Sequence, residues 1–171
     1  MKQACKNNKR FRIIYQYKRQ PSMGSSKMRD NIERWLIHES LSFDEISNSE
    51  NNFHIIAKHA GQFGIPIEVF EPKAQPGVLV IGAKIAMKNN QIARYQGFNE
   101  YEKEKFEKKV SDFCYSIQAV NKIITEDGKQ KIGVYVVLDE KTDVNQQTFF
   151  EAIKRVSEMH EKTSRFLMKT F

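Results

Sequence analysis

Two segments of this sequence have apolar residues on both sides of a predicted strand, and this feature limits the fold more than any other. Side chains alternate between the two faces of a strand, so every second residue shares a face. One face of segment 78–87 is unbroken and consists of Leu79, Ile81, Ala83, Ile85 and Met87. The other face of 78–87 and both faces of 131–138 are also largely apolar. An antiparallel sheet with one wet face usually alternates apolar and polar residues. We therefore expect one face to form the core and a helix, a partner subunit or a bound segment to cover the second.

Three further apolar stretches have the length of strands. Two of them, 53–59 and 65–70, are separated by a turn that contains glycines. The third is 119–125. A short polar segment that contains Asp127-Gly128 separates it from the predicted strand at 131–138. An Asp-Gly pair between two β-rich runs predicts a hairpin, because both central residues of the favoured turn have positive φ.

Helical spacing of apolar residues appears in three segments. The first covers 30–40 and is expected to anchor in the core through Trp35, and the second covers 99–115. The third extends from an N-cap at Asp143 or Asn145 to the C-terminus.

These elements follow one another in the order α-β-β-β-α-β-β-α, with short connections and no alternating strand–helix repeat. Short connections favour antiparallel pairing. The sequence therefore predicts an α+β fold with a mostly antiparallel five-stranded sheet, contained in a single domain at 30–171.

The basic charge is concentrated at the N-terminus. Of the 28 basic residues nine precede Asp30, where no acidic residue occurs, which leaves 19 basic residues against 21 acidic ones in the rest of the chain. We call residues 1–29 the basic arm. Three interpretations remain open: the arm binds nucleic acid or anionic lipid, it serves only solubility, or translation begins at Met23 or Met28. If it binds nucleic acid, aromatic residues interleaved with cations would stack on and contact a single strand. The candidate contacts are Arg10, Arg12, Lys18 and Arg19.

No motif of a catalytic, cofactor-binding or metal site occurs in the sequence. The histidines lack an HExxH pattern, and His38 and Glu39 are not expected to form an acid/base dyad, because adjacent helical residues do not face each other. Cys114 lies on the apolar stripe of a predicted helix and is expected to be a buried, inert thiol. Capping and turn roles are expected for the acidic residues before the last helix. These are Asp139, Glu140 and Asp143. We expect no enzymatic activity, no cofactor and no metal.

No apolar run approaches the roughly 18 residues that cross a bilayer, and the N-terminal segment lacks the apolar centre of a signal peptide. We expect a soluble, cytoplasmic protein without a membrane partner.

Three stretches carry a resemblance to a known family. They are IERWLIHE (32–39), FHIIAK (53–58) and VYVVLDEKTDVNQQTFFEAIKRV (134–156). These stretches, and the order of elements, resemble a family of uncharacterised archaeal proteins with a type III secretion chaperone-like (Tir chaperone-like) fold, over 30–171. The resemblance implies a homodimeric scaffold that holds an extended partner segment, and it transfers no site residues, because a fold alone is a weak warrant for function.

The function expected from these observations is a non-enzymatic protein-interaction or chaperone-like module of unknown partner, acting as a homodimer. Its candidate interface lies on the second face of the two doubly apolar strands, at Val80, Tyr135 and Val137. Nucleic-acid binding through the basic arm is the alternative.

Overall fold

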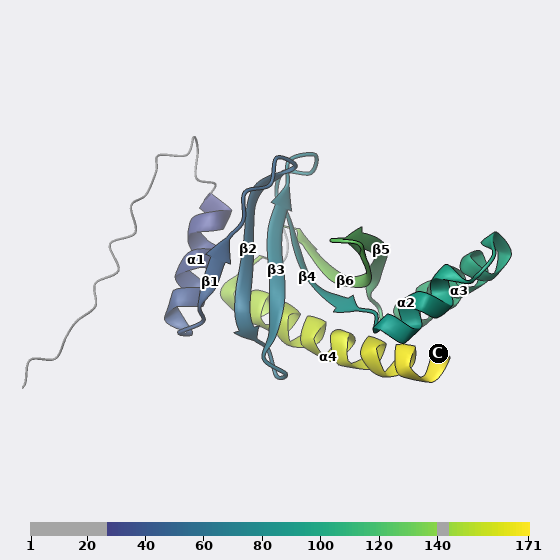
Figure 1. Ribbon diagram of the computed structural model, residues 1–171. Coiled ribbons are helices and arrows are strands. Elements are labelled where there is room, and N and C mark those ends of the chain that lie inside the picture. Colours follow the sequence, from purple (N-terminus) through teal and green to yellow (C-terminus); the bar gives the residue numbers. More distant parts are fainter. Residues whose placement is uncertain (1–26, 140–143) are drawn as a thin grey trace, which may run out of the picture.

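The computed structural model describes residues 27–139 and 144–171, which form an α+β fold with a six-stranded antiparallel sheet and four helices (Figure 1). The strands are β1 (Phe43–Glu45), β2 (Asn51–Ala60), β3 (Ile65–Pro72), β4 (Val78–Ala86), β5 (Val120–Glu126) and β6 (Lys129–Asp139). The helices are α1 (Lys27–His38), α2 (Asn89–Gln96), α3 (Glu100–Ser116) and α4 (Gln146–Thr170). In the sheet the strands lie in the order β1-β2-β3-β4-β6-β5.

The predicted sheet lacks one strand, β1, and the predicted order of elements also lacks one helix, α2. Both predictions are wrong in this respect. The strand β1 has only three residues, two of them acidic, and it exists because its backbone pairs with β2. Such a segment has no periodicity for a sequence pattern to detect. The helix α2 is eight residues long and mostly polar, so its apolar positions are too few to indicate a helix.

The predicted hairpin is confirmed. β5 and β6 pair in register from Val120 opposite Tyr135 to Glu126 opposite Lys129. The turn residues Asp127 and Gly128 have φ of 53° and 71°, which is the left-handed conformation that the favoured two-residue turn requires.

The core lies between one face of the sheet and α4, which crosses the strands in Figure 1. The face of β4 that was expected to be the core is buried throughout, from Leu79 to Met87 at alternate positions. Facing it, α4 buries Phe149, Ile153, Val156, Met159, Thr163 and Leu167. The helix is capped by Asn145, whose side chain accepts a hydrogen bond from the amide of Thr148. Asn145 is thus the cap, and Asp143 lies outside the described residues.

The first helix attaches to the core differently from the prediction. It begins at Lys27, before the predicted start at residue 30, and buries Met28, Ile32 and Leu36. Trp35 is only half-buried and packs at the edge of the core, where its ring centroid lies 5.7 Å from that of Phe149. The helix is therefore anchored by its aliphatic residues rather than by Trp35.

No helix among residues 27–139 and 144–171 is long and apolar enough to cross a membrane. The boundary between the basic arm and the domain remains a prediction, since residues 1–26 lie outside the described part of the chain.

Replacing Leu36 by Ala should lower the free energy of unfolding by about 2–5 kcal/mol, because a fully buried side chain leaves a cavity. Replacing Ile37, which is 66% exposed in the same helix, should change it by less than about 0.5 kcal/mol. Trp35→Ala should fall between the two. Urea unfolding of the three variants measures this order, and an equal loss for Leu36→Ala and Ile37→Ala would show that α1 is not packed on the core.

Candidate functional site

The face of the sheet opposite the core is the candidate site, and we call it the open face. It is defined by the strand register. Its residues include His54, Ile56, Glu68, Phe70, Val80, Gly82, Lys84, Val120, Lys122, Ile124, Glu126, Lys131, Gly133, Tyr135 and Val137. Two of these, Val120 and Val137, are 59% and 50% exposed, although both are apolar.

The helices approach the sheet from the core side. The long helix α4 contacts β3, β4 and β6, whose core-face residues are almost completely buried. The Ser111 hydroxyl in α3 donates a hydrogen bond to Oδ1 of Asn121, at 3.4 Å. Asn121 pairs with the core residue Val134 and thus lies on the core face of β5. A helix was one of the three coverings expected for the second face. Among the described residues, no helix covers that face.

An apolar patch occupies one end of the open face, and it contains the three interface residues expected from the sequence. We define it as Phe70, Val80, Tyr135 and Val137. Val80 lies between Phe70 and Val137 in the strand register. The Phe70 and Tyr135 rings meet edge to face, with centroids 6.4 Å apart. The sequence thus correctly placed Val80, Tyr135 and Val137 on one surface, and their role as an interface remains a prediction.

Two glycines shape this patch. Gly82 pairs with Tyr135 across β4 and β6, and Gly133 lies two residues before Tyr135 on the same face. A side chain at either glycine would overlap the Tyr135 ring, and at Gly133 it would meet the hydroxyl. The ring therefore lies flat along the sheet, in a recess that exists because Gly82 and Gly133 have no side chains.

A lysine–glutamate cluster borders the apolar patch. Lys84 Nζ is 2.6 Å from Oε1 of Glu68 and 2.6 Å from Oε1 of Glu126, and Lys131 Nζ is 2.7 Å from Oε2 of Glu126. These four residues come from β3, β4, β5 and β6. The cluster therefore joins four strands of the sheet through side chains on the open face.

The cluster holds Glu126 and Lys84 in their charged forms. Hydrogen bonds from Lys131 and Lys84 lower the pKa of Glu126 to about 2. Burial alone would lower the pKa of Lys84, but its hydrogen bonds to Glu126 and Glu68 outweigh burial, so this pKa lies above its ordinary value. Both groups remain ionised near neutral pH.

Two other open-face groups favour their neutral forms. His54 is buried beside Phe70, with ring centroids 5.3 Å apart, and neither of its ring nitrogens has a hydrogen-bond partner among the described residues. Burial lowers its pKa. Burial likewise raises the pKa of Tyr135, so its hydroxyl keeps its proton. The apolar patch is thus uncharged at neutral pH.

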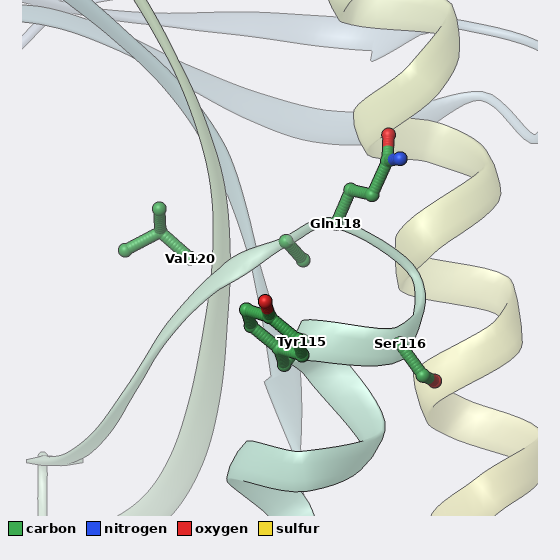
Figure 2. Close-up of a pocket in the computed structure, with 5 residues that line it drawn as sticks. Tyr115, Ser116, Gln118 and Val120 are labelled. Atoms are coloured by element: carbon green, nitrogen blue, oxygen red, sulfur yellow. The ribbon is translucent and has the colours of Figure 1, made fainter.

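A shallow hollow of about 510 Å³ lies where α3 leads into β5. It is lined by Tyr115, Ser116, Gln118, Ala119 and Val120. Figure 2 shows Tyr115 and Ser116 at the end of the helix, with Gln118 and Val120 on the segment that follows. The Tyr115 side chain is 85% exposed, and Gln118 is held by Arg155 of α4, which donates a hydrogen bond to its Oε1 at 2.8 Å. The hollow adjoins the open face through Val120, which pairs with Tyr135.

The remaining candidates from the sequence lie elsewhere. Cys114 is buried as expected, and burial raises the pKa of its thiol to about 11. His38 and Glu39 do face each other, because the helix ends at His38, and Nδ1 of His38 lies 3.2 Å from Oε1 of Glu39. Both side chains are exposed to solvent, so nothing around them indicates an acid/base role.

The nucleic-acid candidates Arg10, Arg12, Lys18 and Arg19 lie outside the described residues, as do Glu140 and Asp143. Within residues 27–139 and 144–171, no three His, Cys, Asp or Glu side chains gather as a metal site would require.

The lysine–glutamate cluster and the glycine recess were not predicted from the sequence. A signal was present, because Lys84 interrupts an otherwise apolar face and Glu68 occupies the middle of a predicted strand. Only the register shows that Lys84, Glu68 and Glu126 are neighbours.

Comparisons with known proteins place the chain in a family and among solved folds. Residues 28–167 match the family described as "Uncharacterized conserved protein (DUF2299)". No curated protein matches the sequence. The fold is similar to an uncharacterized protein from Methanothermobacter thermautotrophicus, with a TM-score of 0.65 and 14% identity over 84% of this chain and 99% of that one. It is also similar to YbjN from E. coli, "a putative transcription regulator", with a TM-score of 0.50 and 13% identity over 80% of this chain and 91% of that one. At these identities the likeness concerns the fold alone, and the secretion chaperone-like resemblance remains a prediction.

Replacing Glu126 by Gln should remove a pH-dependent contribution to stability. The pKa of Glu126 is lowered in the folded state, so its contribution is present above about pH 4.5 and is lost as the pH falls toward about 2. Because the side chain is 42% exposed, we expect a loss of about 1 kcal/mol or less per ion pair at pH 7. Urea unfolding at pH 7 and pH 3 measures the difference, which should shrink at the lower pH. Glu104→Gln, on the exposed surface of α3, serves as the control, and a difference that grows at low pH would contradict the assignment.

Proposed function

The chain belongs to the DUF2299 family of uncharacterized conserved proteins, and we propose that it is a non-enzymatic binding module whose open face holds an extended segment of another protein. The observation that carries this proposal is the apolar patch, in which Phe70, Val80 and Tyr135 are half-buried and Val137 is half-exposed. Contiguous exposed apolar surface with a polar border is characteristic of protein interaction sites.

The arrangement of the patch suits an extended occupant. Neighbouring strands lie about 4.8 Å apart, so Phe70, Val80 and Val137 form a row of side chains across β3, β4 and β6. A segment laid across these strands would meet successive apolar side chains of the row. The flat Tyr135 ring leaves room beside the row, and its hydroxyl can donate or accept a hydrogen bond.

The lysine–glutamate cluster supports a role in binding rather than in catalysis. Its carboxylates and ammonium groups are engaged with one another at hydrogen-bond distance, so they are not poised to transfer protons. By joining four strands, the cluster keeps the face rigid, which lowers the entropic cost of binding a partner. It also forms a charged border on one side of the patch.

Peptide selection tests this function directly. Random peptides of about ten residues, enough to cross the sheet, are displayed on phage and selected on the full chain. The selected peptides are then measured by fluorescence anisotropy. The variant Val137→Glu should fold normally, because the side chain is 50% exposed, and should bind these peptides at least about tenfold more weakly, because a carboxylate would be desolvated against apolar groups.

The matched control is Met168→Glu, which introduces the same charge at a 55% exposed apolar residue of α4, away from the open face. Unchanged affinity for Met168→Glu with loss for Val137→Glu supports the proposal. Equal affinities for the two variants, or no selected peptide, would reject the open face as the binding surface.

Nucleic-acid binding through the basic arm is the second candidate, and the concentration of cations before Asp30 favours it. The description of YbjN as a transcription regulator points in the same direction, although that protein shares only 13% identity.

A salt titration separates this candidate from the first. Binding of a single-stranded oligonucleotide by the full chain should weaken with salt, at a slope of about −0.7 per neutralised phosphate in log affinity against log salt. Replacing Arg10, Arg12, Lys18 and Arg19 by Gln should flatten that slope. The control replaces four exposed lysines of α3 and α4, namely Lys105, Lys108, Lys154 and Lys162. No binding by the unaltered chain, or an equal effect of both sets, would reject the arm as the contact.

A further inference from the structure

Among residues 27–139 and 144–171, no strand pairs with the outer edge of β5. β5 is the last strand of the sheet, and its neighbour there is β6. At the other end of the sheet, β1 has three residues, whereas β5 has seven. Unpaired edges of this length can accept another strand, and native proteins usually block them with charges, bulges or covering elements.

The residues of β5 complement themselves in one antiparallel register. If β5 pairs with β5 of a second copy about a two-fold axis at Ile124, Lys122 lies directly opposite Glu126 of the partner subunit. The same pair recurs on the other side of the axis, and Ile124 meets its own counterpart. Side chains directly opposite in an antiparallel pair lie about 4.5–5.5 Å apart, within reach of an ion pair.

The charges required for this pairing are available. Lys122 is exposed, and no ion pair to it is found among the described residues. Glu126 is 42% exposed, and each of its oxygens accepts from a lysine of its own chain. A carboxylate oxygen has a second lone pair, so Glu126 can accept a further hydrogen bond from the partner subunit's Lys122.

The ends of β5 fit in the same register. Val120 would lie opposite Gly128 of the partner subunit, and Val120 is one of the residues that line the hollow beside Tyr115. The exposed Asp127-Gly128 turn of each copy would therefore lie next to the hollow of the other copy.

We propose that two copies of this chain associate through antiparallel pairing of β5 with β5, centred on Ile124. The two six-stranded sheets become one, and the two open faces become continuous across the axis. This pairing uses the strand edge rather than the apolar patch, so it stands independently of the proposed peptide binding.

Disulfide cross-linking tests the register. In the full chain with Cys5→Ser, Ile124→Cys places two thiols on the axis, where directly opposite Cα atoms lie within the disulfide range of about 4.4–6.8 Å. Cys114 stays in place, because it is buried and its thiol pKa is about 11. Val120→Cys is the matched control, because the residue is exposed, takes no part in the charge pairs, and its two copies would be about 27 Å apart. Oxidation should give a covalent dimer for Ile124→Cys and not for Val120→Cys.

Light scattering tests the association itself. The full chain should have the mass of a dimer at micromolar concentration, and Lys122→Glu should weaken the dimer at least about tenfold, because two attractive pairs become repulsive. Lys154→Glu on the exposed surface of α4 makes the same charge change and should have no effect.

Three outcomes would overturn the proposal. A monomeric mass for the unaltered chain would mean that the charge of Lys122 prevents pairing at this strand edge and that Lys122 is not a dimer contact. Efficient cross-linking of Val120→Cys would require another register. A dimer unaffected by Lys122→Glu and not cross-linked by Ile124→Cys would place self-association on another surface, such as the apolar patch.

Discussion

The pairing of β4 with β6 is the contact on which the other parts of the structure depend. It extends over the full nine residues of β4, and both strands are largely apolar on both faces. Burial of one face under α4 supplies the core, and this leaves the other face apolar without a helix from the described residues to cover it. The same pairing that stabilises the fold therefore also creates the candidate binding surface, because it places Val80 beside Val137 and next to Tyr135 on the open face.

The open face combines features that stability alone would not select. Gly82 and Gly133 weaken the strands in which they lie, since glycine contributes no side chain and loses more backbone entropy on folding. They are explained by the flat position of the Tyr135 ring. Lys84 and Glu68 lose hydration on a partly buried surface, and the ion pairs of Lys84 with Glu68 and Glu126 offset this loss. Both features define a surface of fixed shape, which is what recognition of a partner requires.

The sequence was sufficient for elements with strong periodicity or turn chemistry. Alternation in 78–87, the Asp127-Gly128 pair and the apolar stripe of the last helix each correspond to an element of the structure. Prediction failed for β1, which is formed by pairing with β2, and for Trp35, because helical spacing does not distinguish a fully buried position from one beside it. The interface candidates Val80, Tyr135 and Val137 were found from alternation alone. The lysine–glutamate cluster was not, because it joins residues far apart in sequence.

The two contacts of β6 differ in how much chain they enclose. The hairpin with β5 closes across two residues, whereas the pairing with β4 encloses all of α2, α3 and β5. Loop closure costs more entropy as the enclosed chain lengthens, and non-local pairing slows folding. We expect the β5–β6 hairpin to form early and to dock on β4 late. Until docking, the apolar residues of β6 are exposed to solvent on both faces, so the interval before docking is the step at which this chain is most exposed to aggregation.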